Sequence, residues 1–185
     1  MDSRWVRGAQ SWIARATMER FGRLYPARVA ILHPGTHPVD DRDLPFSAGN
    51  PNDERMSDQQ VSLLSQLLLA TPGGPQTPVA AALYAGFLRE DELPRERDGS
   101  QWEPAWMDVY YLRFAVVQGT LGELIPESTL ERWGPLIELS YLWAEDGSWG
   151  LTSPPDLAFS QLGGSEELIV RALATPGLNA APWPE

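Results

Sequence analysis

The stretch from Leu139 to Leu173, LSYLWAEDGSWGLTSPPDLAFSQLGGSEELIVRAL, decides the fold of this chain. Two runs suited to extended backbone flank Asp146-Gly147, and Asp-Gly favours the two positive-φ positions of a type I′ hairpin turn. After Pro154-Pro155 a third strand is expected at 157–162, and Ser165 is well suited to cap a following helix. The stretch therefore predicts strand, tight turn, strand, strand and helix, in that order.

The register of this hairpin places two tryptophans close together. If the turn has two residues, Ala144 faces Trp149, and Trp143 lies on the diagonal from Trp149, within reach of a large aromatic ring. Together with Trp133, these side chains could form an aromatic surface that binds a ligand. The alternative is one side of a sheet packed beneath helices, which is the more frequent role at this spacing. Trp143 and Trp149 are therefore candidate binding residues.

The size and composition of the chain favour one α+β domain. Its 185 residues can bury a sizeable core, and 17 Pro with 16 Gly favour many short elements over a bundle of long helices. No repeat or linker divides the sequence, so we predict a single domain over 1–185, with a mainly antiparallel sheet and helices packed on it. Because no apolar run could cross a bilayer and no signal-peptide pattern begins the chain, we expect a cytoplasmic protein.

An N-terminal amphipathic helix is predicted for residues 1–25, where Trp5, Trp12 and Phe21 fall at helical spacing between arginines. A basic helix of this kind could lie on an acidic membrane surface. The alternative is that its aromatic stripe packs onto the core while its arginines meet the acidic remainder of the chain. We favour the second interpretation and expect no membrane partner.

Further elements are predicted upstream of the closing stretch. Residues 27–32 (ARVAIL) and 109–118 (VYYLRFAVVQ) are expected to be strands. Ser57 opens a helix, because it forms a capping box with Gln60 ahead of a leucine-rich run. The run at 78–88 (PVAAALYAGFL) is open to both interpretations, since its alanines favour a helix while its bounding prolines allow a strand.

Long loops are expected at 38–56 and 89–108, and the C-terminal tail at 176–185 is expected to be a loop held by Trp183. Arg113 is the only charged residue of the strand predicted at 109–118. We therefore expect its side chain to point outward or to meet an acid, and we treat Arg113 as a third candidate binding residue.

Several kinds of chemistry are excluded by composition. The chain has no Cys and no Lys, which excludes disulfides, thiolate catalysis, Cys-ligated zinc, a P-loop lysine and a Schiff base. It also lacks the G-x-S-x-G motif of a nucleophile elbow. The adjacent acids Glu145 and Asp146 lie in a predicted turn, with no apolar pocket to raise a pKa for acid–base catalysis. We predict no catalytic residue and no cofactor.

One cluster has the composition of a metal site. His33, His37, Asp40, Asp41 and Asp43 lie within eleven residues, and imidazole and carboxylate groups are ligands for divalent metals. His33, His37 and Asp40 are therefore candidate metal ligands. The alternative is a turn that ends a strand and is capped by aspartates, because the spacing does not place the group on one helical face.

Charge is unevenly distributed along the sequence. Residues 1–39 hold six Arg against two acids, a net charge of +4, while residues 40–185 hold eight Arg against 23 acids, a net charge of −15. The acidic portion disfavours nucleic-acid binding, because phosphate contacts need a basic surface. It favours a basic protein partner, although solubility alone is the alternative explanation of such a charge.

The closing stretch is similar to the C-terminal region of a family of uncharacterised proteins found across actinobacterial genomes. Members have a strand, a turn of the form W-P-x-D-R-x-W, a strand, an acidic pair, and Y-V-G-G-S before a helix. Residues 142–149 (LWAEDGSW) resemble that turn and residues 162–165 (LGGS) resemble the V-G-G-S. Residues 25–34 (YPARVAILHP) are similar to the family's Y-A-R-V-L-H-P strand. The resemblance implies that the segment at 82–87 is a strand.

The resemblance also has departures. Gly147 stands where the family tends to have Arg, and Pro154-Pro155 replaces an acidic-apolar pair. Because the family has no known activity, the resemblance implies an architecture and no mechanism. We predict a non-catalytic acidic protein that binds another macromolecule in an immunity-like or regulatory role. The alternative is a small-ligand-binding or metal-binding protein, or an enzyme, that uses His33, His37 and the nearby aspartates.

Overall fold

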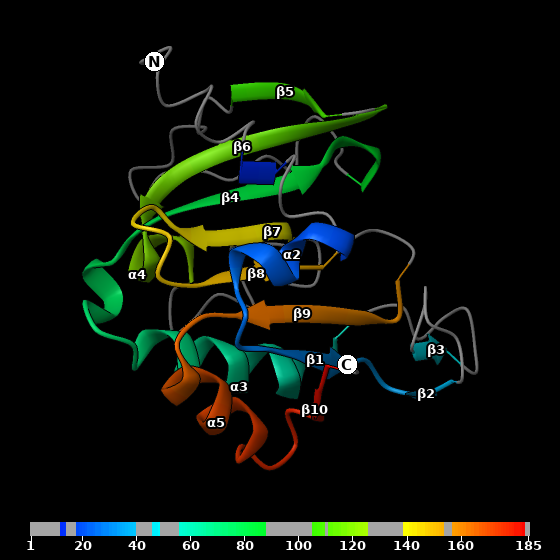
Figure 1. Cartoon of the computed structure of the whole chain (residues 1–185). Coiled ribbons are helices and arrows are strands. Elements are labelled where there is room, and N and C mark those ends of the chain that lie inside the picture. The colour runs from blue at the N-terminus through cyan, green and yellow to red at the C-terminus, as the bar shows by residue number, and fades with distance from the viewer. Residues whose placement is uncertain are drawn as a thin grey trace.

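An eight-stranded antiparallel sheet forms the centre of the protein (Figure 1). The computed structural model describes residues 12–13, 18–39, 46–48, 56–87, 105–109, 111–125, 139–153 and 157–183. The strand order is β10-β1-β9-β8-β7-β4-β6-β5. The strands are β1 (Arg28–Leu32), β4 (Pro78–Tyr84), β5 (Ala105–Val109), β6 (Leu112–Thr120), β7 (Leu139–Ala144), β8 (Gly150–Thr152), β9 (Phe159–Gly163) and β10 (Ala180–Pro182).

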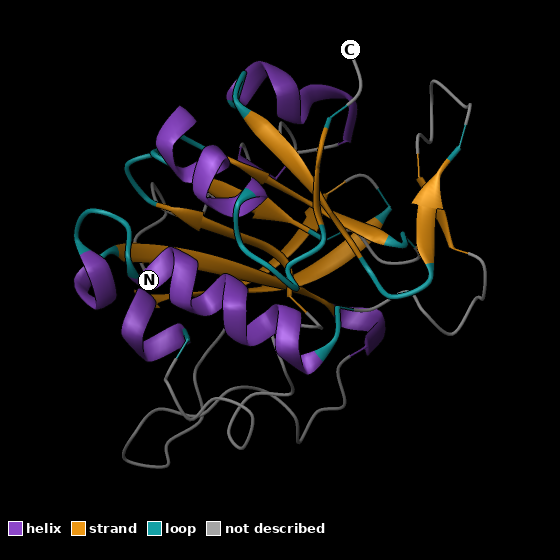
Figure 2. Cartoon of the chain, turned by 90° about the horizontal axis from the view of Figure 1, so that it is seen from below, coloured by secondary structure: helices purple, strands orange, loops and turns teal. Residues whose placement is uncertain are grey.

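The remaining described elements are short. A second, two-stranded sheet pairs β2 (Thr36–Pro38) with β3 (Phe46–Ala48). The helices are α2 (Met18–Leu24), α3 (Asp58–Leu69), α4 (Leu121–Leu124) and α5 (Glu166–Leu173), with 3-10 turns η1 (Gly74–Gln76) and η2 (Ala85–Phe87). Helices lie on both sides of the strand layer (Figure 2), which confirms the predicted α+β fold. Of the helices that the structure describes, none has the length and apolar character needed to span a bilayer.

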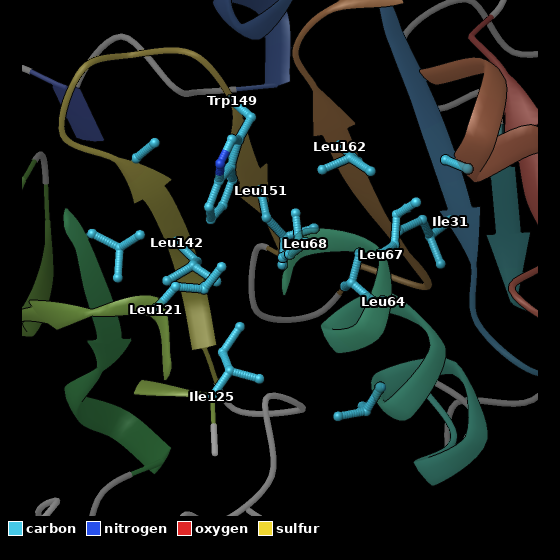
Figure 3. Close-up of a cluster of buried hydrophobic side chains, with 14 of the residues drawn as sticks. Ile31, Leu64, Leu67, Leu68, Leu121, Ile125, Leu142, Trp149, Leu151 and Leu162 are labelled. Carbon is cyan, nitrogen blue, oxygen red and sulfur yellow. The ribbon is translucent and has the colours of Figure 1, made fainter. Parts of the chain in front are cut away.

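One face of the sheet, which we call the aliphatic face, packs against α3 and α5. Successive side chains of a strand point to opposite faces, so alternate residues such as Val79 and Ala81 of β4 reach this side. Figure 3 shows how the leucines of α3 meet the strand side chains: Leu64, Leu67 and Leu68 face Leu142, Leu151 and Leu162. Burying one such side chain contributes about 1.5–3 kcal/mol, so this face is a main source of stability.

The opposite face, which we call the aromatic face, is covered by Trp12 and α2. Trp12 stacks on Trp143 with ring centroids 4.5 Å apart and ring planes at 10°. Gly150 and Gly163 form a cross-strand pair beneath these rings. A Cβ atom on Gly150 would lie 2.7 Å from the Trp12 ring, and one on Gly163 would lie 2.4 Å from Tyr25 Cβ. Glycine is needed at both positions because the covering side chains approach so closely.

The predicted order of the closing stretch is confirmed, but the type of its turn is wrong. Ala144 N–H donates to the Trp149 carbonyl (3.2 Å), and Gly147 N–H donates to the Ala144 carbonyl (2.9 Å). In this loop of four residues only Gly147 has a positive φ, 74°. Asp146 stays outside the left-handed region because its carboxylate accepts a hydrogen bond from Ser148 N–H (2.9 Å), which forms an Asx turn.

The helix caps and two further elements follow the sequence. Ser57 and Gln60 form the predicted capping box at the start of α3, and Ser165 Oγ accepts from Leu168 N–H at the start of α5. The open segment at 78–88 is a strand over its first seven residues. Its alanines occupy a central strand that is covered on both faces, where small side chains let the layers approach.

The N-terminal helix is confirmed only where it is described. Residues 12–13 are helical, and α2 follows them from Met18 to Leu24. Residues 1–11 and 14–17 lie outside the described part of the chain, and Tyr25 follows the end of α2. The buried side chains of Trp12 and Phe21 agree with the interpretation that the aromatic stripe packs onto the core.

The strand predicted at 109–118 is in fact the meeting point of two strands. Val109 of β5 pairs with Leu112 of β6, so the chain reverses between them. The prediction is confirmed at 112–118, which belong to β6, and wrong at its start, because the tyrosines between the two strands are not among the residues that usually mark a turn.

Three predicted loops contain short strands. β5 begins within 89–108 and ends at Val109, β3 lies within 38–56, and β10 lies within the tail at 176–185. Each has three to five residues and forms by pairing with a neighbour, so its own hydrophobic pattern gave little signal. Of the segment 38–56 the structure describes 38–39, 46–48 and 56, and of the segment 89–108 it describes 105–108. The remaining residues of both segments lie outside the described part of the chain.

Candidate functional site

His33 of the predicted metal site is buried where β1 ends. Its side chain is only 2% exposed, and Nε2 lies 2.9 Å from Ser160 Oγ. Ser160 Oγ in turn donates to Ser153 Oγ (2.9 Å). The backbone N–H of His33 donates to the Ala158 carbonyl at 3.0 Å. These contacts tie the end of β1 to the segments that flank β8 and β9, which is a structural role.

The other two candidate ligands, His37 and Asp40, do not form a site with His33 within the described residues. His37 is exposed on β2, and Asp40 lies outside the described residues. Within the described residues, no group of three or more His, Asp or Glu side chains could hold a metal ion. A histidine beside a serine is also the start of a hydrolytic relay, but Ser160 is completely buried and out of reach of a substrate.

Trp143 and Trp149 do not share a surface, so the diagonal contact predicted from the register is wrong. Trp143 is buried on the aromatic face, whereas Trp149 lies in the aliphatic core beside Leu151 and Leu142 (Figure 3). The physical reason is alternation. Trp149 is opposite Ala144 in the hairpin, and Trp143 precedes Ala144, so its side chain points to the other face. Trp133 lies outside the described residues.

The side chain of Arg113 points outward, which is one of the two orientations expected for it from the sequence. Its guanidinium lies 4.9 Å from the centroid of the Trp106 ring, a cation–π contact. Trp106 is 45% exposed and Tyr111 is 92% exposed. Sequence reasoning missed both, because it placed Trp106 in a loop and Tyr111 inside a strand. We refer to Trp106, Tyr111 and Arg113 as the aromatic edge, since they lie on the outermost hairpin of the sheet.

A groove of about 310 Å³ lies between α3 and α5. Arg171, on its wall, donates to the Ala70 carbonyl at the end of α3 (3.3 Å). The groove has no carboxylate, histidine or serine, so its lining supplies no acid, base or nucleophile. Its lining residues are Leu63, Gln66, Leu67, Arg171, Ala174 and Thr175.

Four exposed carboxylates gather at the opposite end of the sheet from His33. We call Glu145, Asp146, Glu166 and Glu167 the acidic rim. The first two lie in the turn between β7 and β8, and the last two lie in the first turn of α5. Figure 1 shows that this turn, α4 and the start of α5 lie at one end of the strands, while β2 and β3 lie at the other.

The two halves of the acidic rim adjoin each other. A Cβ atom on Gly164, just before α5, would lie 3.3 Å from the Ser148 carbonyl of the turn. The turn is also fixed on its other side, because Glu145 N–H donates to the Pro78 carbonyl (2.9 Å) and its carboxylate accepts from Gln118 Nε2. The turn half of the rim is therefore held by a backbone hydrogen bond to β4 and a side-chain hydrogen bond from β6.

The local environment of the rim favours negative charge. Hydrogen bonds from the Ser148 side chain, and then from the Ser148 backbone, hold the pKa of Asp146 below its usual range. Glu166 and Glu167 lie at the positive end of the α5 dipole, which favours a negative charge there. Sequence reasoning identified Glu145 and Asp146 as turn residues, but it did not place them beside the acids at the start of α5.

No family model, curated protein or solved structure matches this chain. The resemblance to the actinobacterial family therefore stays a prediction, and the function is argued from the geometry of the described residues.

Proposed function

We propose that this is a non-catalytic cytoplasmic protein that binds a basic protein through the acidic rim. The observation that carries the proposal is the convergence of four exposed carboxylates from the β7–β8 turn and the start of α5. The backbone hydrogen bond from Glu145 to Pro78 and the cap of α5 keep these groups in place before a partner arrives. A backbone that is fixed in advance lowers the conformational entropy that is lost on binding.

The charge of the chain supports the same partner. Residues 40–185 carry a net charge of −15, so the field of the body adds to that of the rim. Complementary charge accelerates association with a cationic protein and makes it sensitive to salt, because ions screen exposed charges beyond about 8 Å at physiological ionic strength. The same field repels nucleic-acid phosphates and anionic lipid headgroups. A basic toxin that the protein neutralises, or a basic regulatory target, has the required chemistry.

The alternative function at His33, His37 and Asp40 has less support. His33 is buried against Ser160, and its neighbouring backbone is fixed by hydrogen bonds to the segment before β9. A ligand or metal at this place would have to displace contacts that join three strands.

The proposal is tested by affinity capture from a lysate of the cells that carry this sequence. Three baits are compared: the wild type, the rim variant Glu145→Gln/Glu167→Gln, and the control Asp58→Asn/Asp108→Asn. Each variant removes two exposed negative charges. The control sites lie at the start of α3 and in edge strand β5, away from the rim.

A basic protein should be enriched by the wild type and the control and reduced about tenfold by the rim variant. The rim variant removes two carboxylates, and each exposed ion pair contributes up to about 1 kcal/mol. A combined loss of about 1.4 kcal/mol corresponds to a tenfold change in affinity. The same protein should be released when salt is raised. Equal capture by all three baits, or capture that salt does not affect, would contradict the proposal.

A further inference from the structure

Thr152 and Gln161 are buried polar residues on the aromatic face whose side chains are not satisfied by the described protein. They are paired directly across β8 and β9, and both are 0% exposed. Within the described residues, Thr152 Oγ1, Gln161 Nε2 and Gln161 Oε1 have no hydrogen-bond partner. Directly paired side chains project from the same face with Cβ atoms about 4.5–5.5 Å apart. Three unsatisfied polar atoms therefore occupy one small region.

This arrangement is unusual for a protein interior. About 90% of buried polar groups in proteins have a hydrogen-bond partner, and the exceptions call for an explanation. A molecule that bonds to the pair would satisfy them.

The pair lies between two aromatic clusters. On one side, along the same strands, are Gly150 and Gly163 with the covering rings of Trp12 and Tyr25. On the other side is the cluster of Phe46, Phe159 and Trp183, whose ring centroids lie 5.3–5.8 Å apart. The polar region is thus enclosed by apolar rings, which exclude bulk water.

The neighbouring sheet positions define what the region can accept. Gln161 is opposite Ala30 on its other side, and Thr152 is opposite Tyr141. Both directly paired neighbours are uncharged, and the cation on this face of β1, Arg28, is placed over the Trp183 ring, 5.6 Å from its centroid. An ion beside Thr152 and Gln161 would therefore lack a directly paired compensating charge. A hydroxyl and an amide each donate and accept, so the matching molecule is neutral and has at least one donor and one acceptor.

We propose that Thr152 and Gln161 bind a small uncharged molecule that has both a hydrogen-bond donor and an acceptor. The molecule lies on the aromatic face of the sheet, against the paired strands β8 and β9. Ordered water and a small amide-bearing solute share this chemistry. Buried waters occur at roughly one per 27 residues and typically make about three hydrogen bonds. The site is separate from the acidic rim and does not depend on the function proposed for it.

A matched pair of threonines tests the proposal. Thr71 is also buried, and its hydroxyl donates to the Leu68 carbonyl (2.7 Å). Replacing either threonine with valine keeps the shape and removes the hydroxyl. If Thr152 has a bound partner, Thr152→Val should lower the Tm by about 2–4 °C, as Thr71→Val should. If Thr152→Val leaves the Tm unchanged or raises it while Thr71→Val lowers it, the proposal is overturned.

Two buried glutamines provide the second comparison. Gln60 Nε2 donates to the carbonyls of Leu32 (2.7 Å) and Leu178 (3.0 Å), so Gln60→Met loses known hydrogen bonds. We expect Gln161→Met to lower the Tm as well. A higher Tm for Gln161→Met would show that the amide had no partner to lose, and would overturn the proposal.

A high-resolution crystal structure of the wild type, with mass spectrometry of the denatured protein, identifies the bound molecule. Density bridging Thr152 Oγ1 and the Gln161 amide, with no organic molecule released, supports the proposal and identifies water. Bridging density with release of a stoichiometric neutral compound supports it and identifies a solute. If the amide bonds directly to Thr152 and no density lies between them, the proposal is overturned.

Discussion

The two ends of the central sheet carry different polar chemistry. At one end, His33, Ser153 and Ser160 bond to one another and join three strand ends. At the other end, the four carboxylates of the acidic rim are exposed on a turn and on the start of α5. His33, which the sequence marks as a candidate metal ligand, therefore stabilises the fold. The acids that look like ordinary turn and helix-start residues form the exposed charged surface.

This contrast has a direct consequence for mutations. Changes at the His33 end should reduce the free energy of unfolding and leave binding unchanged. Changes at the acidic rim should weaken binding with little effect on stability, because exposed charges contribute little to folding.

Phe159→Ala should have the largest effect on stability. Phe159 is 1% exposed and contacts the rings of Phe46 and Trp183 at the His33 end. Truncating a buried Phe leaves a cavity and typically lowers the free energy of unfolding by about 3–5 kcal/mol. Urea unfolding measures the loss, and Tyr111→Ala, at an exposed position, is the control. A loss below about 1 kcal/mol would show that this cluster is not packed as described.

Ser160→Ala should lower the free energy of unfolding by about 1–3 kcal/mol, because it leaves buried polar groups of His33 and Ser153 without that hydroxyl. Ser62→Ala, on the exposed side of α3, is the matched control and should change stability little. Equal stability of Ser160→Ala and wild type in urea would remove the structural role assigned to His33.

Gly147→Ala tests the turn that carries half of the rim. Gly147 has φ 74°, and a Cβ atom there would meet nothing within 4 Å, so the substitution acts on the backbone alone. We expect a loss of about 1–2 kcal/mol, because side chains disfavour the left-handed region. Gly147→Asn should lose less, since Asn tolerates this conformation better. If Ala and Asn are equally stable, the turn does not require the left-handed conformation.

Asp146→Asn should show the smallest effect, and the effect should depend on pH. The folded pKa of Asp146 is lowered by its Ser148 hydrogen bonds, so its ionised form stabilises the fold above the unfolded pKa of about 3.9. This stability should be lost as pH falls through the folded pKa. Because the group is exposed, we expect a difference of a few tenths of a kcal/mol at pH 7. Urea unfolding at pH 7 and near pH 3 measures it, and a difference that grows toward acid would contradict the assignment.

Much of the fold followed from local signals in the sequence. Ser57 and Ser165 marked helix starts, because a cap depends only on residues within one turn. The strands at 28–32 and 139–144 followed from apolar runs bounded by turn residues. In contrast, β3 and β5 pair with strands that are close in the sequence, but with three and five residues they carry little pattern of their own. β10 pairs with β1, which is distant in the sequence, so no local pattern shows it.

The candidate site was harder to predict for the same reason. Trp143 and Trp149 are close in the hairpin, yet a turn of four residues and strand alternation place them on opposite faces. The acidic rim combines Glu145 with Glu167, which are brought together by the packing of α5 beside the β7–β8 turn. The burial of His33 likewise depends on Ser160, far along the chain.

The most direct test of the account compares binding by four forms of the protein in the same affinity capture: wild type, Glu145→Gln/Glu167→Gln, Asp58→Asn/Asp108→Asn, and Ser160→Ala. The account predicts that a basic protein is captured by the wild type, the charge control and Ser160→Ala, and is reduced about tenfold for the rim variant. Capture that survives in the rim variant but is lost in folded Ser160→Ala would contradict it, because binding would then depend on the His33 end.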